Sequence, residues 1–117
     1  MDNLGLYELK FKSWNINGYN SKYLGNKLLD CDFLNEVKAF DIVSLLETHA
    51  YGKDLQLPGY KSPFRRDEAP RGKTKKSFGG IAVFVKDYLI AEKVIKWVKT
   101  DNENVIWLKI DKKFLNA

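Results

Sequence analysis

The clearest indication of the fold is the run Asp41-Ile42-Val43-Ser44-Leu45-Leu46-Glu47. Its centre is almost continuously aliphatic and β-branched, which is typical of a strand covered on both faces of a sheet. Upstream, residues 7–12 alternate apolar and charged side chains and predict a strand with one solvated face. Between these strands we expect a helix that is capped by Ser21. Its apolar positions recur at helical spacing, at Leu24, Leu28, Cys31, Phe33 or Leu34, and Val37. Together the three elements predict a βαβ unit.

The rest of the chain predicts further strands but no further helix. Residues 13–18 contain Asn and Gly and predict a turn, and residues 48–77 predict a loop with a short strand at 55–60. Strands are then expected at 80–86, 90–99 and 105–111, with a hairpin turn at 101–104. We therefore predict an α/β fold with one mixed, mostly antiparallel sheet and one main helix.

Several of the predicted strands are apolar on both pleat faces, and a single helix covers part of one face only. The other face would leave apolar area in water at a cost of roughly 25 cal/mol per Å². An exposed apolar face of that size usually marks a contact surface. The pattern therefore predicts either a piece of a larger fold or a chain that pairs with another sheet.

Composition narrows the function classes. The chain has 117 residues, enough for one domain, and its net charge of +5 favours an anionic partner, nucleic acid first. A single cysteine, Cys31, excludes an internal disulfide, and a single histidine, His49, argues against a multi-histidine zinc hydrolase. No stretch has the length of a membrane span and the first residues lack a signal peptide, so we expect an intracellular protein, nuclear or cytoplasmic, that is not secreted and contacts no membrane.

Polar side chains follow two of the predicted strands. Asn15 and Asn17 come after the first strand, and Glu47 ends the second. Side chains at neighbouring strand ends can converge, and their oxygens suit magnesium, which keeps several waters and takes few carboxylates. The alternative interpretation is that the asparagines stabilise a turn while Glu47 is an ordinary surface carboxylate.

A second candidate site is the basic stretch at residues 65–76, which holds six cations and two anions in a predicted flexible loop. Its cations are Arg65, Arg66, Arg71, Lys73, Lys75 and Lys76. Such a loop can neutralise phosphates and bind nucleic acid without sequence preference, or it can be a solvated loop that favours solubility. The nearby Tyr60 and Phe64 are either base-stacking groups or packing anchors.

Three segments together resemble the endonuclease/exonuclease/phosphatase superfamily, and within it the endonuclease domains of LINE-type retrotransposons. They are Ser13-Trp14-Asn15-Ile16-Asn17-Gly18-Tyr19-Asn20-Ser21, Asp41-Ile42-Val43-Ser44-Leu45-Leu46-Glu47-Thr48-His49 and Gly79-Gly80-Ile81-Ala82-Val83-Phe84-Val85. The resemblance implies a four-layer α/β sandwich of two packed sheets. It also implies metal-dependent hydrolysis of phosphate esters.

The same resemblance implies roles for individual residues. Glu47 would be a direct ligand of Mg²⁺ or Mn²⁺, and Asn15 would lie in the catalytic pocket. Asn17 would edge the metal site where many relatives carry aspartate, so its neutral amide implies weaker metal binding. Asn20 and Lys22 would approach the DNA backbone.

Other elements of the family pattern find no match in residues 1–117. A later tyrosine, an Asp-x-Asn pair, a further aspartate and a closing aspartate–histidine pair would all follow this sequence. The expectation is therefore a single truncated domain: half of the sandwich, catalytically incomplete alone, and completed by a homodimer through the sheet face or by a C-terminal half. The alternative is a non-catalytic module for nucleic-acid binding or dimerisation. His49 is either a loop histidine or half of a Glu–His metal pair.

Overall fold

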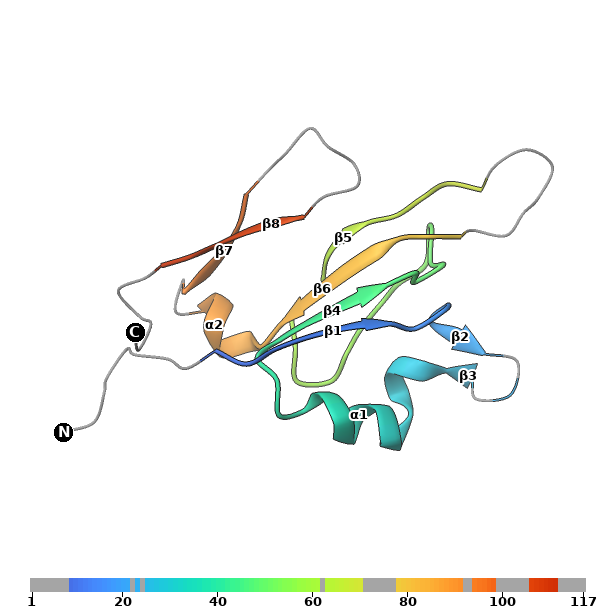
Figure 1. Ribbon diagram of the computed structural model, residues 1–117, viewed down its shortest axis with the longest axis horizontal. Coiled ribbons are helices and arrows are strands. Elements are labelled where there is room, and N and C mark those ends of the chain that lie inside the picture. The colour runs from blue at the N-terminus through green and yellow to red at the C-terminus, as the bar shows by residue number, and fades with distance from the viewer. Residues whose placement is uncertain are drawn as a thin grey trace.

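The centre of the molecule is a four-stranded mixed sheet, shown in Figure 1 as a computed structural model. The structure describes residues 9–21, 23, 25–61, 63–70, 78–91, 94–98 and 106–111. The strands in spatial order are β1 (Phe11–Asn15), β4 (Ile42–Leu46), β6 (Ile81–Val85) and β5 (Phe64–Arg66). β1 runs parallel to β4, while the β4–β6 and β6–β5 pairs are antiparallel. The predicted mixed α/β fold is confirmed.

Strand β1 starts later than the sequence predicts. Its parallel register with β4 pairs Phe11 with Ile42 and Asn15 with Leu46, so the strand includes positions that were expected to form a turn. Trp14 stacks on Phe33 of the helix below, with 5.1 Å between ring centroids. This packing extends the strand to Asn15, because the aromatic side chain needs the regular alternation of a sheet to reach the helix.

The helix expected from Ser21 onward forms only in part, over Cys31–Val37. The structure has instead a small antiparallel pair, β2 (Asn20–Ser21) with β3 (Gly25–Asn26), a 3₁₀ turn η1 (Lys27–Leu29) and a short helix α1 (Cys31–Val37). Gly25 takes a left-handed φ of 67°, which turns the chain back between β2 and β3. Asp30 starts α1, since its extended backbone and its carboxylate, which accepts from the amide of Phe33, make it the N-cap.

One face of the sheet packs on α1, η1 and the segment that follows β4. Alternate residues of the two central strands point to this side: Val43 and Leu45 from β4, and Ala82 and Phe84 from β6. They meet Leu28, Phe33, Val37, Leu55 and Leu57 in one buried cluster. Residues 55–60 were expected to form a strand, but they form no strand; Leu55 and Leu57 fill this core and Tyr60 makes an isolated bridge to Lys86.

The other face of the sheet is covered too, against expectation. A second helix, α2 (Asp87–Ala91), follows β6, and a hairpin of β7 (Ile95–Val98) and β8 (Trp107–Ile110) follows it in turn. Ile42, Val83 and Val85 pack on this side against Leu89, Val94 and Ile95. Figure 1 shows α2 and the hairpin on the opposite side of the sheet from α1. The predicted bare face is therefore wrong, and the pairing of two copies through it loses the observation that motivated it.

The remaining predictions each concern one strand or turn. The strands expected at 80–86 and 105–111 are present as β6 and β8, whereas the one at 90–99 begins only at Ile95 because α2 occupies the preceding residues. The turn at 101–104 lies outside the described residues. No helix in the described part of the chain is both long and apolar enough to cross a bilayer.

Candidate metal corner at the carboxyl ends of β1 and β4

The ends of β1 and β4 bring two of the predicted site residues into contact. Their parallel register places Asn15 beside Leu46, the residue that precedes Glu47. From there the side-chain amide nitrogen of Asn15, Nδ2, donates a hydrogen bond to Glu47 Oε2. Both residues are exposed. The expected convergence of the two strand ends is confirmed, and we call this pair the Asn15–Glu47 corner.

Asn17 supports the corner through its backbone. Its amide donates to Asn15 Oδ1 over 3.1 Å, so the Asn15 side chain is held at both its oxygen and its nitrogen. The side chain of Asn17 itself is exposed, and its backbone takes a left-handed φ of 47°. Lys27 lies against the same turn, where its ammonium donates to the carbonyl oxygens of Ile16 at 2.7 Å and Asn17 at 3.4 Å. The sequence pattern did not single out this lysine, because it predicted an α-helix where Lys27 begins the 3₁₀ turn η1.

The backbone that carries Glu47 is strained and clamped. Glu47 and His49 have φ values of 54° and 52°, in the left-handed region that non-glycine residues seldom adopt. The chain from 47 to 49 is hydrogen bonded on both sides: the amides of Gly18 and Tyr19 donate to the carbonyl oxygens of Glu47 and Thr48, and the amides of Thr48 and His49 donate to those of Gly80 and Gly79. Such strain costs about 1–3 kcal/mol per residue and gathers at functional sites.

Thr48 shows why a glycine stands at position 80. The Thr48 side chain is fully buried, and a Cβ on Gly80 would lie 2.5 Å from its Oγ1. Gly80 also has a φ of 94°, which disfavours any side chain. The contact between Thr48 and Gly80 thus sets the path of the backbone between Glu47 and His49. Within the described residues, Thr48 Oγ1 has no hydrogen-bond partner.

His49 packs against Gly18 and Phe78. Its Nδ1 lies 3.1 Å from the position a Cβ would take on Gly18, and its ring forms a T-shaped contact with that of Phe78, with 5.4 Å between centroids. Strand β4 ends at Leu46, so Glu47 and His49 do not share a strand face. Sequence reasoning singled out neither Phe78 nor this contact.

The donors of the corner fit a magnesium ion that keeps most of its water. Glu47 offers a carboxylate, whereas the Asn15 carbonyl oxygen already accepts from the Asn17 amide. Mg²⁺ binds through one or two carboxylates and keeps several waters. In the part of the chain that the structure describes, no three His, Cys, Asp or Glu side chains gather into a denser metal site. The fit is that of a weak, open site rather than a protein cage.

The basic residues predicted to contact nucleic acid divide into two groups. Arg65 and Arg66 lie in strand β5 rather than in a flexible loop, and both are half-buried. Arg65 forms an ion pair with Asp67 at 3.0 Å and donates to the carbonyl oxygen of Ala50. Asn20 is exposed in β2. Outside the described residues lie Lys22, Arg71, Lys73, Lys75 and Lys76.

The two aromatic residues expected near this stretch are packing anchors. The Tyr60 hydroxyl donates to the carbonyl oxygens of Val37 and Phe40, and burial, followed by the charge of Asp41, raises the pKa of Tyr60 to about 12. Phe64 packs against the cluster on the second face of the sheet. Neither ring is presented to a ligand at the corner.

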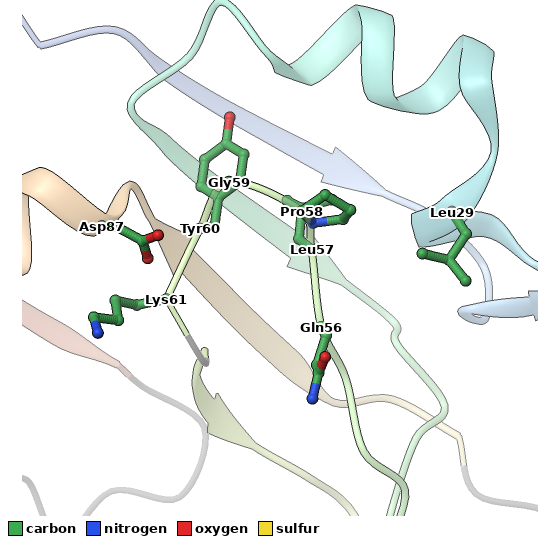
Figure 2. A pocket seen from close by; sticks show the side chains of 8 residues that line it. All are labelled: Leu29, Gln56, Leu57, Pro58, Gly59, Tyr60, Lys61 and Asp87. Atoms are coloured by element: carbon green, nitrogen blue, oxygen red, sulfur yellow. The ribbon is translucent and has the colours of Figure 1, made fainter.

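A separate hollow of about 430 Å³ lies at the other end of the molecule from the corner. Figure 2 shows Tyr60 and Pro58 in its wall, with Lys61 and Asp87 together at one side. The isolated bridge between Tyr60 and Lys86 places this wall near the carboxyl end of β6, whereas the corner is near its start. Of the predicted site residues that the structure describes, Tyr60, a candidate base-stacking group, lines this hollow.

Comparison with known proteins places the chain in a family. A model described as the endonuclease/exonuclease/phosphatase family matches residues 13–116, which span the corner and the three motifs that resemble the family. No match was found among curated proteins or among solved structures.

Proposed function

Because this chain belongs to the endonuclease/exonuclease/phosphatase family, we propose that its Asn15–Glu47 corner binds Mg²⁺ or Mn²⁺ together with a nucleic-acid phosphate. The family points to nuclease- or phosphodiesterase-type chemistry in general, and its enzymes generally use divalent metals. The observation that carries the proposal is the hydrogen bond from Asn15 to Glu47 at adjacent strand ends, held by a strained and clamped backbone.

Each residue of the corner has a distinct task in this proposal. Glu47 supplies the anionic oxygen for the cation, and Asn15 fixes the orientation of that carboxylate. The amide of Asn15 has two N–H groups, so the one not bonded to Glu47 can donate to a phosphate oxygen. Asn17 holds the Asn15 carbonyl in place through its backbone amide. When bound, the cation supplies Lewis-acid stabilisation of charge on the phosphate.

We further propose that the corner turns over phosphodiesters poorly by itself. The chain contains one histidine, and among the described contacts its ring packs on Gly18 and Phe78. A nuclease of this type needs a general base for water and groups that stabilise the transition state. We propose that those groups come from a C-terminal half or from a second copy of this chain.

A non-catalytic binding module is the second candidate. The net charge of +5 and the four cations within residues 71–77 favour binding to phosphates whether or not cleavage follows. The likeness of the three motifs to LINE-type retrotransposon endonucleases makes DNA the first substrate to test. Homodimerisation stays a proposal, and light scattering on a size-exclusion column would test it.

Cleavage of supercoiled plasmid with Mg²⁺ or Mn²⁺ distinguishes the two candidates. We expect slow nicking or none from the chain, and any nicking should disappear in Glu47→Gln and persist in Glu36→Gln. Glu36 is a suitable control because it is an exposed glutamate on α1, away from the corner. Nicking that survives Glu47→Gln would refute the assignment of the corner.

A further inference from the structure

Phe78 is an exposed aromatic residue beside the Asn15–Glu47 corner. It is 54% exposed, whereas Phe33 and Phe84 are buried in the core. Two glycines separate it from Ile81, which starts β6 and pairs with Leu46 at the end of β4. Phe78 therefore lies at the same end of the sheet as Glu47. An apolar ring of this size in water is a candidate contact surface, although a single one is common on protein surfaces.

The ring of Phe78 packs against His49. His49 forms a T-shaped contact with it, with an interplanar angle of 69°. His49 is itself held by the hydrogen bond from its amide to the carbonyl oxygen of Gly79, at 2.8 Å, and by the close approach of its ring to Gly18. A side chain at position 18 would push the imidazole away, because Nδ1 is only 3.1 Å from the Cβ position and φ is 92°. The pair is thus fixed by the same segments that hold Glu47.

The sequence that directly precedes Phe78 is rich in cations, and the Glu68 carboxylate lies beside the neighbouring Gly79. Residues 71–77, which directly precede Phe78, contain Arg71, Lys73, Lys75 and Lys76 and no acidic residue. Proteins that bind single-stranded nucleic acid combine cations for the backbone with aromatic faces for the bases. A paired base in a duplex has both faces covered by its neighbours, so an exposed ring favours an unpaired base.

We propose that Phe78, supported by His49, is a stacking shelf for an unpaired base of a DNA or RNA strand. The strand would cross the carboxyl ends of β1 and β4, with one of its phosphates at the corner. This last placement rests on the proposed function, but the stacking itself does not depend on a metal. The inference thus names the substrate as a single strand, or a duplex with a displaced base, rather than regular duplex.

Fluorescence anisotropy of labelled oligonucleotides in EDTA tests the shelf without the metal site. Wild type should bind a single-stranded dodecamer more tightly than a duplex of the same sequence. Phe78→Leu keeps an apolar side chain but removes the π-face, and it should weaken single-strand binding about tenfold, since stacking on an aromatic ring is worth roughly 1–3 kcal/mol per base. Phe78→Tyr should retain binding to within about twofold, because the face remains.

The matched control is Phe11→Leu. Phe11 is 59% exposed, as accessible as Phe78, but it starts β1 and so lies at the opposite end of the sheet from Asn15. The Phe11→Leu substitution should leave single-strand binding unchanged. The shelf is refuted if Phe78→Leu binds like wild type, if Phe11→Leu is equally weakened, or if Phe78→Leu weakens self-association in light scattering while single-strand binding is unchanged.

A second variant gives a direct signal from the shelf. Phe78→Trp should show quenching on addition of the single strand beyond that of wild type, and its absence would count against stacking. Glu47→Gln should leave binding in EDTA unchanged. If the Phe78 variants behave as expected but Glu47→Gln still binds metal, the proposed function fails while the shelf stands. If Glu47→Gln loses metal binding but Phe78→Leu binds the single strand like wild type, the shelf fails while the proposed function stands.

Discussion

The two ends of the sheet each carry a carboxylate, and they use it in opposite ways. At one end Asp41 accepts hydrogen bonds at both oxygens, from the Lys10 amide at 2.9 Å and from the Tyr88 hydroxyl at 2.6 Å. At the other end Glu47 accepts at one oxygen, from Asn15, as far as the described residues show. Asp41 thereby joins β4 to the start of α2, whereas Glu47 joins only two strand ends.

The backbone differs in the same direction. Glu47 and His49 are in the left-handed region with Asn17 beside them, and these three are the non-glycine residues with positive φ in the described part of the chain. Asp41 is not among them. A carboxylate that accepts hydrogen bonds at both oxygens on unstrained backbone stabilises a fold. A carboxylate that accepts at one oxygen on strained backbone is typical of a functional site. The difference supports a stabilising role for the Asp41 end and agrees with the binding role that we propose for the Glu47 end.

The largest expected effect on stability comes from crowding the strained end. Gly80→Ala places a Cβ 2.5 Å from Thr48 Oγ1 and forces an unfavourable φ, so we expect a loss of about 2–4 kcal/mol in urea unfolding. The control is Gly52→Ala, which has a similar positive φ of 72° but nothing within 4 Å, and should lose only about 1 kcal/mol. Equal losses in the two variants would mean that the contact with Thr48 does not matter.

Asp41→Asn should destabilise the chain by about 1–3 kcal/mol, because an amide cannot accept at both positions as the carboxylate does. Its effect on metal binding should be absent. Chemical unfolding followed by circular dichroism measures the first quantity. An unchanged midpoint would show that the Asp41 end contributes no more to stability than an ordinary surface carboxylate.

Alkaline pH should weaken the Asp41 end selectively. Burial, then the hydrogen bond and charge of Asp41, raises the pKa of Tyr88 to about 12, from an ordinary value of 10.0. The folded state therefore favours the protonated phenol of Tyr88. The contribution of this phenol to the stability of the fold is complete below pH 10 and is lost as the pH rises toward 12. The midpoint temperature of thermal unfolding should fall more steeply with pH across this range in wild type than in Tyr88→Phe. Parallel curves would contradict the role of this hydrogen bond.

The smallest change in stability is expected at the corner itself. Glu47→Gln should alter the free energy of unfolding by no more than about 0.5 kcal/mol, since the side chain is exposed and bonded to a single neighbour. Urea unfolding in EDTA measures it without any contribution from metal. A loss as large as that of Asp41→Asn would erase the distinction between the two ends.

Sequence patterns predicted the parts of the fold that depend on periodicity and strand-end geometry. The aliphatic run at β4 and the parallel βαβ arrangement follow from burial, and they bring Asn15 and Glu47 together. The helix expected between Ser21 and Val37 forms only from Cys31 onward, because Gly25 and the cap at Asp30 divide the segment into shorter elements. Helix α2 was missed since its apolar residues resemble the start of a strand.

Strand β5 was hidden for a related reason. Arg65 and Arg66 are charged, which suggests a solvated loop, but Arg65 is half-buried through its ion pair with Asp67 and its bond to Ala50. Positive φ at Glu47 and His49 could not be predicted, because these residues carry no glycine signal and are forced into that conformation by tertiary hydrogen bonds. The shelf at Phe78 depends on exposure, which a sequence does not report.

Titration with Mn²⁺, followed by the loss of the free-ion electron paramagnetic resonance signal, tests the division between the two carboxylates most directly. We predict that wild type and Asp41→Asn, both checked to be folded, bind one ion with similar affinity, and that Glu47→Gln binds at least about tenfold more weakly. Equal binding by all three proteins, or none by wild type, would contradict the assignment of the metal to the Asn15–Glu47 corner.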